Sequence, residues 1–336
     1  MKVTIKDIAR EAGVSAAAVS LVLNEKECRI AEETKKRIIE VAKKFNYTVN
    51  QQARSLVTKK SNVIGLIIPD IENIFFSSLS KRIEEYCRKK GYAIMIVNSD
   101  ENPQADIELL HLLVSRGVDG ILYTPSIGSD EDYEKVKIYL KSLPVPYVMV
   151  DRYLDDVECN KVYIDNINGS FQAVSMLVKS GHTKIGCIGN AVAKANSRVT
   201  GYKEAMKQFN LPVNENYIYD GQYKAIGGYN AGKEIVNSDL TAVFICNDMM
   251  TLGFLKCLSE YGKKVPDDYS IVSYDNTLHN FVVSPEITTI DQDLGKLARN
   301  SCRLLFKHIN NENAAPEVIC LYPQLLVNES VKLINK

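Results

Sequence analysis

The 336 residues exceed the length of one ordinary domain, and 46% hydrophobic content is enough for a sizeable buried core, while the formal net charge is +0. The chain has no apolar run of signal type or of membrane-spanning length, so a cytoplasmic protein is expected. Its eight cysteines contain no C-x-x-C pair, which favours buried free thiols and argues against a zinc site.

The N-terminal stretch Thr4–Leu23 has the pattern of two short helices joined by a tight turn. Thr4 stands three residues before Asp7, which is the spacing of a helix-capping pair. Gly13 can take the positive φ that ends a helix, and Ser15 can cap the next helix. Apolar residues at helical spacing give each helix one buried face. The stretch therefore predicts a helix-turn-helix unit.

A third helix is expected at about Ala31 to Phe45, where apolar side chains again recur at helical spacing. The second helix is expected to expose small side chains that can enter a DNA major groove. These side chains are Ser15, Ala16, Ala17 and Ser20. Taken alone, the three helices also fit a generic small bundle. Charge favours DNA binding, because residues 1–60 hold 13 Lys or Arg and 7 Asp or Glu, whereas the other 276 hold 28 and 34.

The segment from Asn50 to Ser61 joins this head to the rest of the chain. Asn50 can cap a short helix there, although a helix of that length is not stable alone. A plain polar linker fits the composition equally well.

After residue 61, continuous apolar runs alternate with amphipathic helical stretches in two successive series. Such runs separated by helices indicate parallel sheets that are covered on both faces. Connections near Asp151 to Asp165, Thr288 to Asp293 and Tyr322 to Gln324 would join two lobes. The predicted fold class is an N-terminal all-α helix-turn-helix head followed by an α/β body of two doubly wound parallel-sheet lobes.

Many of the predicted strands end in a short polar residue, among them Asp70, Asp151, Asn190, Asn247 and Asp275. In open α/β sheets, ligands bind outside the carboxyl ends of the strands, so these side chains would converge on a cleft between the lobes. Each residue taken singly is better explained as the cap of the helix that follows it. Their joint recurrence favours a lined pocket.

The sequence gives little support to an enzyme. It contains no G-x-S-x-G, H-E-x-x-H, P-loop or G-x-G-x-x-G motif, and its four histidines lack metal-ligand spacing. Asp248 follows the amide Asn247, and the sequence supplies no carboxylate partner for an acid/base pair. No catalytic residue, metal or cofactor is therefore expected.

Several motifs together resemble the head and hinge of a LacI/GalR-family transcriptional regulator. They are TIKDIAREAGVS, the Asn24 of VLN, the AEET start of the third helix and ARSL at Ala53 to Leu56. The resemblance covers nearly the whole chain and implies a homodimeric repressor with a periplasmic-binding-protein-like body, a near-palindromic DNA operator and a small effector. The chain departs from frequent family residues where DNA sequence is read, at Ala16, Ala17, Leu21 and Val49.

The expected domains are a helix-turn-helix DNA-binding domain at 1–47, a hinge helix or linker at 48–61 and an effector-binding and dimerisation domain at 62–336. Lobe 1 is expected at about 62–162 and 292–322, and lobe 2 at about 163–291 and 323–336. In the hinge, the resemblance implies a helix in the minor groove with Leu56 as an apolar wedge. The DNA-binding candidates are Thr4, Ser15, Ala16, Ala17, Ser20, Asn24, Arg29, Asn50, Arg54 and Leu56.

The family carries ligand contacts at positions that match Asp151, Arg198, Asn247 and Asp275. Carboxylates and a guanidinium suit the hydroxyls of a sugar-like effector, and an aromatic side chain such as Phe76 or Tyr223 can cover a ring face. The effector-binding candidates are Asp70, Phe75, Phe76, Asp151, Arg198, Tyr223, Asn247 and Asp275.

Two functions of different class fit the sequence. The first is a DNA-binding repressor controlled by an effector. The alternative is a cytoplasmic small-molecule-binding protein or degenerate sugar enzyme whose N-terminal bundle is only structural. Removal of residues 1–60 discriminates them, because only the first would lose DNA affinity.

Overall fold

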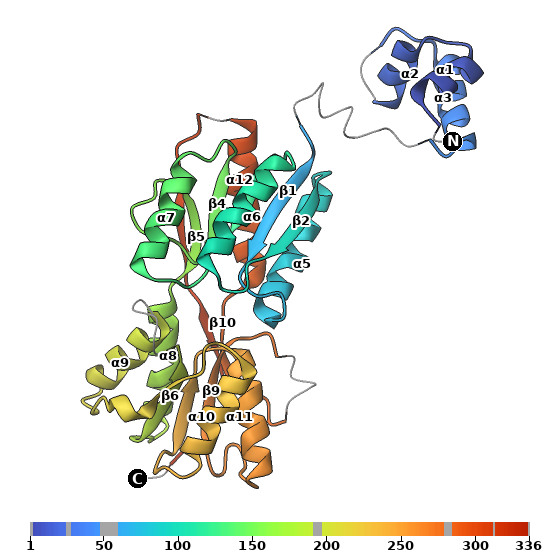
Figure 1. The fold of residues 1–336 in the computed structure, drawn as a ribbon. Helices are drawn as coiled ribbons and strands as arrows, with labels where there is room; N and C mark the ends of the chain where they lie inside the picture. Colours follow the sequence, from blue (N-terminus) through green and yellow to red (C-terminus); the bar gives the residue numbers. More distant parts are fainter. Residues whose placement is uncertain are drawn as a thin grey trace. The chain divides into compact units, whose positions relative to one another are not determined.

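The computed structural model describes residues 3–24, 28–47, 60–190, 197–278, 284–311 and 313–334. The chain divides into two compact units, the head (Met1–Ser61) and the body (Asn62–Lys336). Figure 1 shows the helical head and the two lobes of the body. Among the described residues, no helix has both the length and the apolar character needed to cross a membrane.

The head contains three helices: α1 (Ile5–Ala12), α2 (Ala16–Leu23) and α3 (Glu32–Lys44). The caps are those that the sequence predicts. The Asp7 carboxylate accepts hydrogen bonds from the Thr4 amide (2.9 Å) and the Thr4 hydroxyl (2.7 Å), and Gly13 ends α1 with φ 66°. Ser15 Oγ accepts from the Ala18 amide at 3.1 Å. The three helices bury one small apolar core made of Ile8, Ala9, Ala12, Val19, Val22, Ile38 and Ala42.

Lobe 1 is built on a six-stranded sheet of order β11-β5-β4-β3-β1-β2, in which every neighbouring pair is parallel. Its strands are β1 (Val63–Ile68), β2 (Ala93–Asn98), β3 (Gly120–Tyr123), β4 (Tyr147–Asp151), β5 (Asn160–Ile164) and β11 (Val318–Leu321). Its helices are α5 (Ile74–Lys89), α6 (Pro103–Ser115), α7 (Asp130–Lys141) and α12 (Leu294–Asn310). Helices α5 and α12 pack together over one face, and α6 and α7 pack together over the other.

Lobe 2 is also built on a six-stranded sheet, whose strand order is β12-β10-β9-β8-β6-β7. Its strands are β6 (Ile185–Gly189), β7 (Ile218–Asp220), β8 (Ala242–Ile245), β9 (Ser270–Asp275), β10 (Thr288–Asp291) and β12 (Gln324–Leu326). Its helices are α8 (Asn166–Lys179), α9 (Ser197–Gln208), the 3-10 turn η1 (Glu215–Tyr217), α10 (Ala225–Ile235) and α11 (Asp248–Glu260). Strand β12 pairs antiparallel with β10, so this sheet departs from the predicted parallel pattern at one edge.

The chain passes between the lobes three times, after β5, between β10 and α12, and between β11 and β12. The C-terminal strands and α12, drawn in red, show two of these passages in Figure 1. The expected connection at Asp151 to Asp165 is wrong in one respect, because most of it stays in lobe 1 and includes β5. Side chains of β5 alternate between buried and half-buried, so the strand lacks the continuous apolar run on which the prediction relied.

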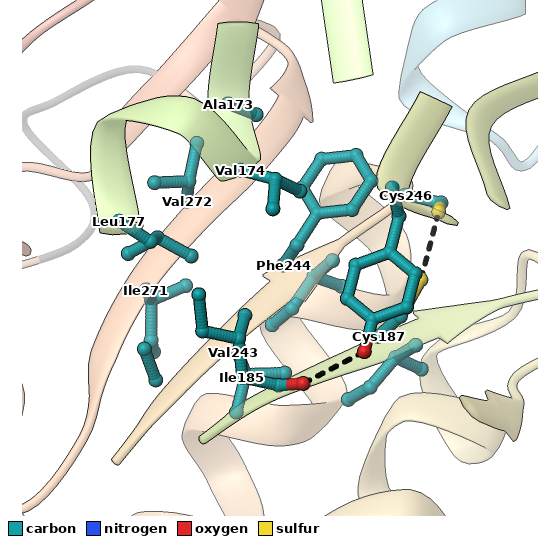
Figure 2. Close-up of a cluster of buried hydrophobic side chains, with 14 of the residues drawn as sticks. Ala173, Val174, Leu177, Ile185, Cys187, Val243, Phe244, Cys246, Ile271 and Val272 are labelled. Carbon is teal, nitrogen blue, oxygen red and sulfur yellow. Dashed lines mark hydrogen bonds between the residues drawn. The ribbon is translucent and has the colours of Figure 1, made fainter. Parts of the chain in front are cut away.

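The core of lobe 2 is a cluster of buried side chains from its strands and helices. Figure 2 shows Phe244 of β8 among side chains of α8 and β9, including Val174 and Val272, all of them fully buried. The Cys187 and Cys246 sulfurs lie 3.8 Å apart as free thiols at the edge of this cluster. All eight cysteines are free and six are buried, as the sequence predicts.

Candidate functional site

A cavity of about 1360 Å³ in the body is lined by residues of both lobes. Seven of the eight effector candidates line it: Phe75, Phe76, Asp151, Arg198, Tyr223, Asn247 and Asp275. The exception is Asp70, which follows β1 and whose Oδ1 accepts from the Glu72 amide at 2.9 Å. Asp70 does not line the cavity and stabilises a local turn instead. The strand-end pattern thus predicts the position of the cavity, but it also selects Asp70, which lies in a local turn outside the lining.

Arg198, the second residue of α9, is a cationic side chain of the cavity that several groups hold in place. Its Nη1 donates to Asp275 Oδ1 at 3.1 Å and to the Cys246 carbonyl, and its Nε donates to Asn166 Oδ1 at 3.1 Å. The guanidinium carbon lies 3.9 Å from the centroid of the Tyr274 ring, within cation–π range. These contacts fix the direction in which Arg198 can present donors to a ligand.

Asp275, the last residue of β9, is the partner of Arg198 and is only 3% exposed. Besides Arg198, it accepts a hydrogen bond from Gln292 Nε2 at 2.6 Å. Burial raises the pKa of Asp275 to about 7, against the opposing effect of the Arg198 charge. Its backbone φ of 103° lies in the region that side-chain-bearing residues rarely adopt, so the carboxylate is held in place at a conformational cost.

Asn247 caps the helix that follows it and also lies on the cavity lining. Its Oδ1 accepts from the Met250 amide at 2.8 Å and caps α11, while its Nδ2 donates to the Tyr223 carbonyl at 3.0 Å. The side chain is 1% exposed and lies on the cavity lining. An amide has four hydrogen-bonding positions, so capping leaves further capacity for a ligand.

Lobe 1 contributes Asp151 and two phenylalanines to the cavity. Asp151 ends β4 with φ 67°, is 8% exposed, and has no hydrogen-bond partner at Oδ1. Burial raises the pKa of this carboxyl, and the Arg152 and Arg198 charges oppose that shift. Phe75 and Phe76, at the start of α5, are 3% and 2% exposed and also pack in the lobe 1 core. They therefore line a wall of the cavity and are part of the core at the same time.

A second arginine, Arg152, also lines the cavity and is not among the residues predicted from the sequence. Its Nη1 and Nη2 donate to Glu101 Oε2 and Oε1 at 2.8 and 2.9 Å, a bidentate pair. Glu101 Oε2 also accepts from the Ile127 amide at 3.0 Å, which ties the pair to the loop after β3. The one available signal was that Arg152 directly follows Asp151, a residue already selected.

Two buried carboxylates hold loops at the carboxyl ends of strands that reach the cavity. In lobe 1, Asp106 accepts from the Tyr123 hydroxyl (2.8 Å), the Ser126 amide (2.9 Å) and the Ser126 hydroxyl (2.8 Å). In lobe 2, Asp248 accepts from the Ser273 hydroxyl, the Thr277 amide and hydroxyl, and the Leu278 amide, at 2.6 to 3.1 Å. Each carboxylate stands in the first turn of a helix and holds the loop after a neighbouring strand.

Replacement of Asp248 by alanine is expected to lower the free energy of unfolding by at least about 3 kcal/mol, because the buried donors of Ser273 and Thr277 and the half-buried Leu278 amide would lose this acceptor. Urea unfolding of the full chain measures the loss. The matched control is Asp239→Ala, whose carboxylate pairs with Lys184 at the surface and is 54% exposed. That change is expected to cost much less stability, because the ion pair and the Tyr217 hydroxyl that Asp239 accepts from are exposed to solvent. Equal losses in the two variants would contradict the role given to Asp248.

The head presents the DNA-binding candidates unevenly. Thr4, Ser15, Ala17 and Arg29 are exposed, whereas Ser20 and Asn24 are half-buried. Ala16 is also half-buried and packs against the head core, so the prediction that it is exposed for reading bases is only partly correct. Leu21 of α2, noted only as a departure from the family, is 36% exposed.

Two of these candidates interact with each other at the end of α2. Asn24 Nδ2 donates to the Ser20 carbonyl at 2.7 Å and to the Ser20 hydroxyl at 3.3 Å. This arrangement holds Asn24 against its own helix. The remaining candidates, Asn50, Arg54 and Leu56, lie outside the described residues.

Two family models match the chain. Residues 4–50 match the model described as "Bacterial regulatory proteins, lacI family", and residues 174–331 match a periplasmic binding protein-like domain. Catabolite control protein A of Priestia megaterium is 33% identical, covering 99% of this chain and 100% of that protein. The HTH-type transcriptional repressor PurR of Histophilus somni is 32% identical, covering 98% of this chain and 99% of that protein.

Solved structures show the same fold. The lac repressor dimer bound to operator and the anti-inducer ONPF matches with a TM-score of 0.87 at 23% identity, covering 99% of this chain and 100% of that chain. A LacI-family regulator of Enterococcus faecium with bound ribose matches with a TM-score of 0.72 at 29% identity, covering 81% of this chain and 100% of that chain. The predicted head and two-lobed body are confirmed.

Proposed function

Since the chain belongs to the LacI family of bacterial regulatory proteins, we propose that it is a repressor that binds a pseudo-palindromic operator as a homodimer and responds to a sugar-like effector in the inter-lobe cavity. That it is a DNA-binding transcriptional regulator, and not an enzyme, follows from its family. The operator, the dimer and the effector site are the proposed parts.

The observation that carries the proposal is that side chains of both lobes line one cavity. Asp151 and Phe76 come from lobe 1, and Arg198 and Asp275 come from lobe 2. A ligand that contacts all of them binds the closed form of the body in preference to the open form, and so shifts the population of the two forms. A coupling of about 1 to 3 kcal/mol between the cavity and the head is enough for regulation.

The effector is sought by thermal-shift screening of sugars, sugar phosphates and nucleosides against the full chain. A ligand that binds only the folded state must raise the melting temperature, by an amount that grows with its concentration relative to Kd. Each hit is then added to a protein–DNA binding assay. If no compound that binds the body changes DNA affinity, effector control is contradicted.

The proposed dimer follows from the small size of one head. A single short helix such as α2 reads few base pairs, and two-fold symmetry in the protein requires matching half-sites in the DNA. The hinge candidates Asn50, Arg54 and Leu56 are proposed to act in the minor groove, with Leu56 as the wedge.

DNA affinity is expected to fall steeply with salt, because the cationic head releases counterions from the phosphates that it contacts. If a dimer neutralises about six phosphates, log affinity falls by about 5 for each unit of log salt. Fluorescence anisotropy with labelled operator at a series of salt concentrations measures the slope, and footprinting shows whether both half-sites are covered. DNA affinity that did not change with salt, or protection of one half-site alone, would contradict the proposal that a dimer binds the operator.

A further inference from the structure

We infer that the effector carries no anionic group: it is a neutral sugar or an amino sugar, and phosphorylated or carboxylated sugars are rejected. The inference rests on the proposed function, because it concerns the ligand of the same cavity. It depends on three observations: the pairing of the cavity arginines, the unsatisfied carboxylate oxygen of Asp151 and the charges of the other lining residues.

The two arginines of the cavity are already neutralised by carboxylates. Arg152 makes its bidentate pair with Glu101, and Arg198 pairs with Asp275 while also donating to a backbone carbonyl. A phosphate or carboxylate on a ligand would have to compete with these buried carboxylates. An anion taken out of water into such a site without a cation of its own is strongly disfavoured.

Asp151 differs from the two arginines, because one of its carboxylate oxygens lacks a hydrogen-bond donor. Its side chain is 8% exposed, lines the cavity and has no hydrogen-bond partner at Oδ1. A buried carboxylate oxygen without a donor is costly, so a ligand that brings a hydroxyl or an ammonium group is stabilised there. A ligand that brings another acceptor gains nothing from Asp151.

The remaining charged residues of the lining are mostly acidic. They are Asp130, Glu131, Lys137, Asp155, Asp156, Asp165 and Asp220. Lys137, the one cation among them, donates to Glu134 at 2.9 Å. The described lining thus holds eight carboxylates and three cationic side chains, with Asp151, Asp275 and the two arginines included. Its field repels an approaching anion and attracts a cation.

The first test compares matched ligands with the full chain. Ribose, glucose and glucosamine are each measured against their phosphorylated forms by thermal shift and isothermal titration calorimetry. We expect at least one unphosphorylated member to bind 30-fold or more tightly than its phosphate, with a smaller ratio in 0.5 M NaCl because salt screens the repulsion. A sugar phosphate that binds as tightly as its parent sugar would overturn the inference.

The second test needs no cognate sugar and uses inorganic phosphate as the probe. In Glu101→Gln, the Arg152 guanidinium loses its carboxylate partner, while the glutamine oxygen can still accept from the Ile127 amide. Phosphate is expected to raise the melting temperature of this variant by more than that of the wild type. The head is identical in both proteins, so any phosphate bound there cancels in the comparison. Equal shifts in the two proteins would show that Glu101 does not mask Arg152 and would overturn the inference.

The proposed function is judged separately. A sugar phosphate that binds and changes operator affinity leaves it standing, whereas a neutral sugar that binds without changing operator affinity contradicts it.

Discussion

Removal of residues 1–60 is expected to abolish operator binding and to leave effector binding unchanged. The head holds the helix-turn-helix and the excess of basic residues, while the rest of the chain has more acidic than basic residues and repels DNA phosphates. The body has its own sheets and cores within a separate compact unit, so its cavity does not depend on the head for its lining. Anisotropy with an operator selected from random DNA measures the first effect, and calorimetry measures the second.

The truncated protein must be folded for this comparison, which circular dichroism establishes. Its effector affinity is expected to lie within about twofold of the full chain's in the absence of DNA, a difference of no more than about 0.4 kcal/mol. If the truncated protein still bound the operator, the head would be only structural. The alternative of a small-molecule-binding protein with a structural N-terminal bundle would then be favoured.

Replacement of Arg198 by alanine is expected to remove the response to the effector while operator affinity stays near that of the wild type. The side chain donates to Asp275, Asn166 and the Cys246 carbonyl, and its loss leaves a buried carboxylate without its cation. If Arg198 donates two charge-assisted hydrogen bonds to the effector, their loss weakens effector binding by about 100-fold or more. Calorimetry with the ligand found by screening measures this change.

Two variants separate this role from a general effect on folding. Arg88→Ala removes a surface arginine that pairs with Glu84 at 3.0 Å, and it is expected to leave both effector and operator affinity unchanged. Arg198→Lys keeps the positive charge but not the forked donors, so its effector affinity is expected to lie between wild type and Arg198→Ala. If Arg198→Ala bound the ligand normally, or lost operator binding while folded, the site assignment would be wrong.

The parts of the fold that local chemistry determines are predictable from the sequence. The capping pair Thr4–Asp7 and the turn at Gly13 fix the head within a few residues, and they form as expected. The alternation of apolar runs and helices gives the two lobes, because strands covered on both faces must be apolar throughout. Strand β5 was missed because one of its faces is only half-buried.

The cavity is predictable in outline for a topological reason: parallel strands place their carboxyl ends at one edge of a sheet. Asp151, Asn247 and Asp275 could therefore be selected as strand-end residues. The pair Glu101–Arg152 could not, because it joins positions 51 residues apart through side-chain contacts that no local pattern records. Asp70 was selected by the same strand-end rule but does not line the cavity, because a strand-end aspartate can instead accept a hydrogen bond within a local turn.

The proposed repressor requires energetic coupling between the cavity and the head. This coupling is measured as the affinity of the full chain for its effector in the presence and in the absence of saturating operator DNA. Linkage requires the operator to change effector affinity by the same factor as the effector changes operator affinity, about 5- to 150-fold for a coupling of 1 to 3 kcal/mol. We expect equal factors within that range, and we expect the operator to have no effect on effector affinity once residues 1–60 are removed. The same effector affinity with and without operator would contradict it.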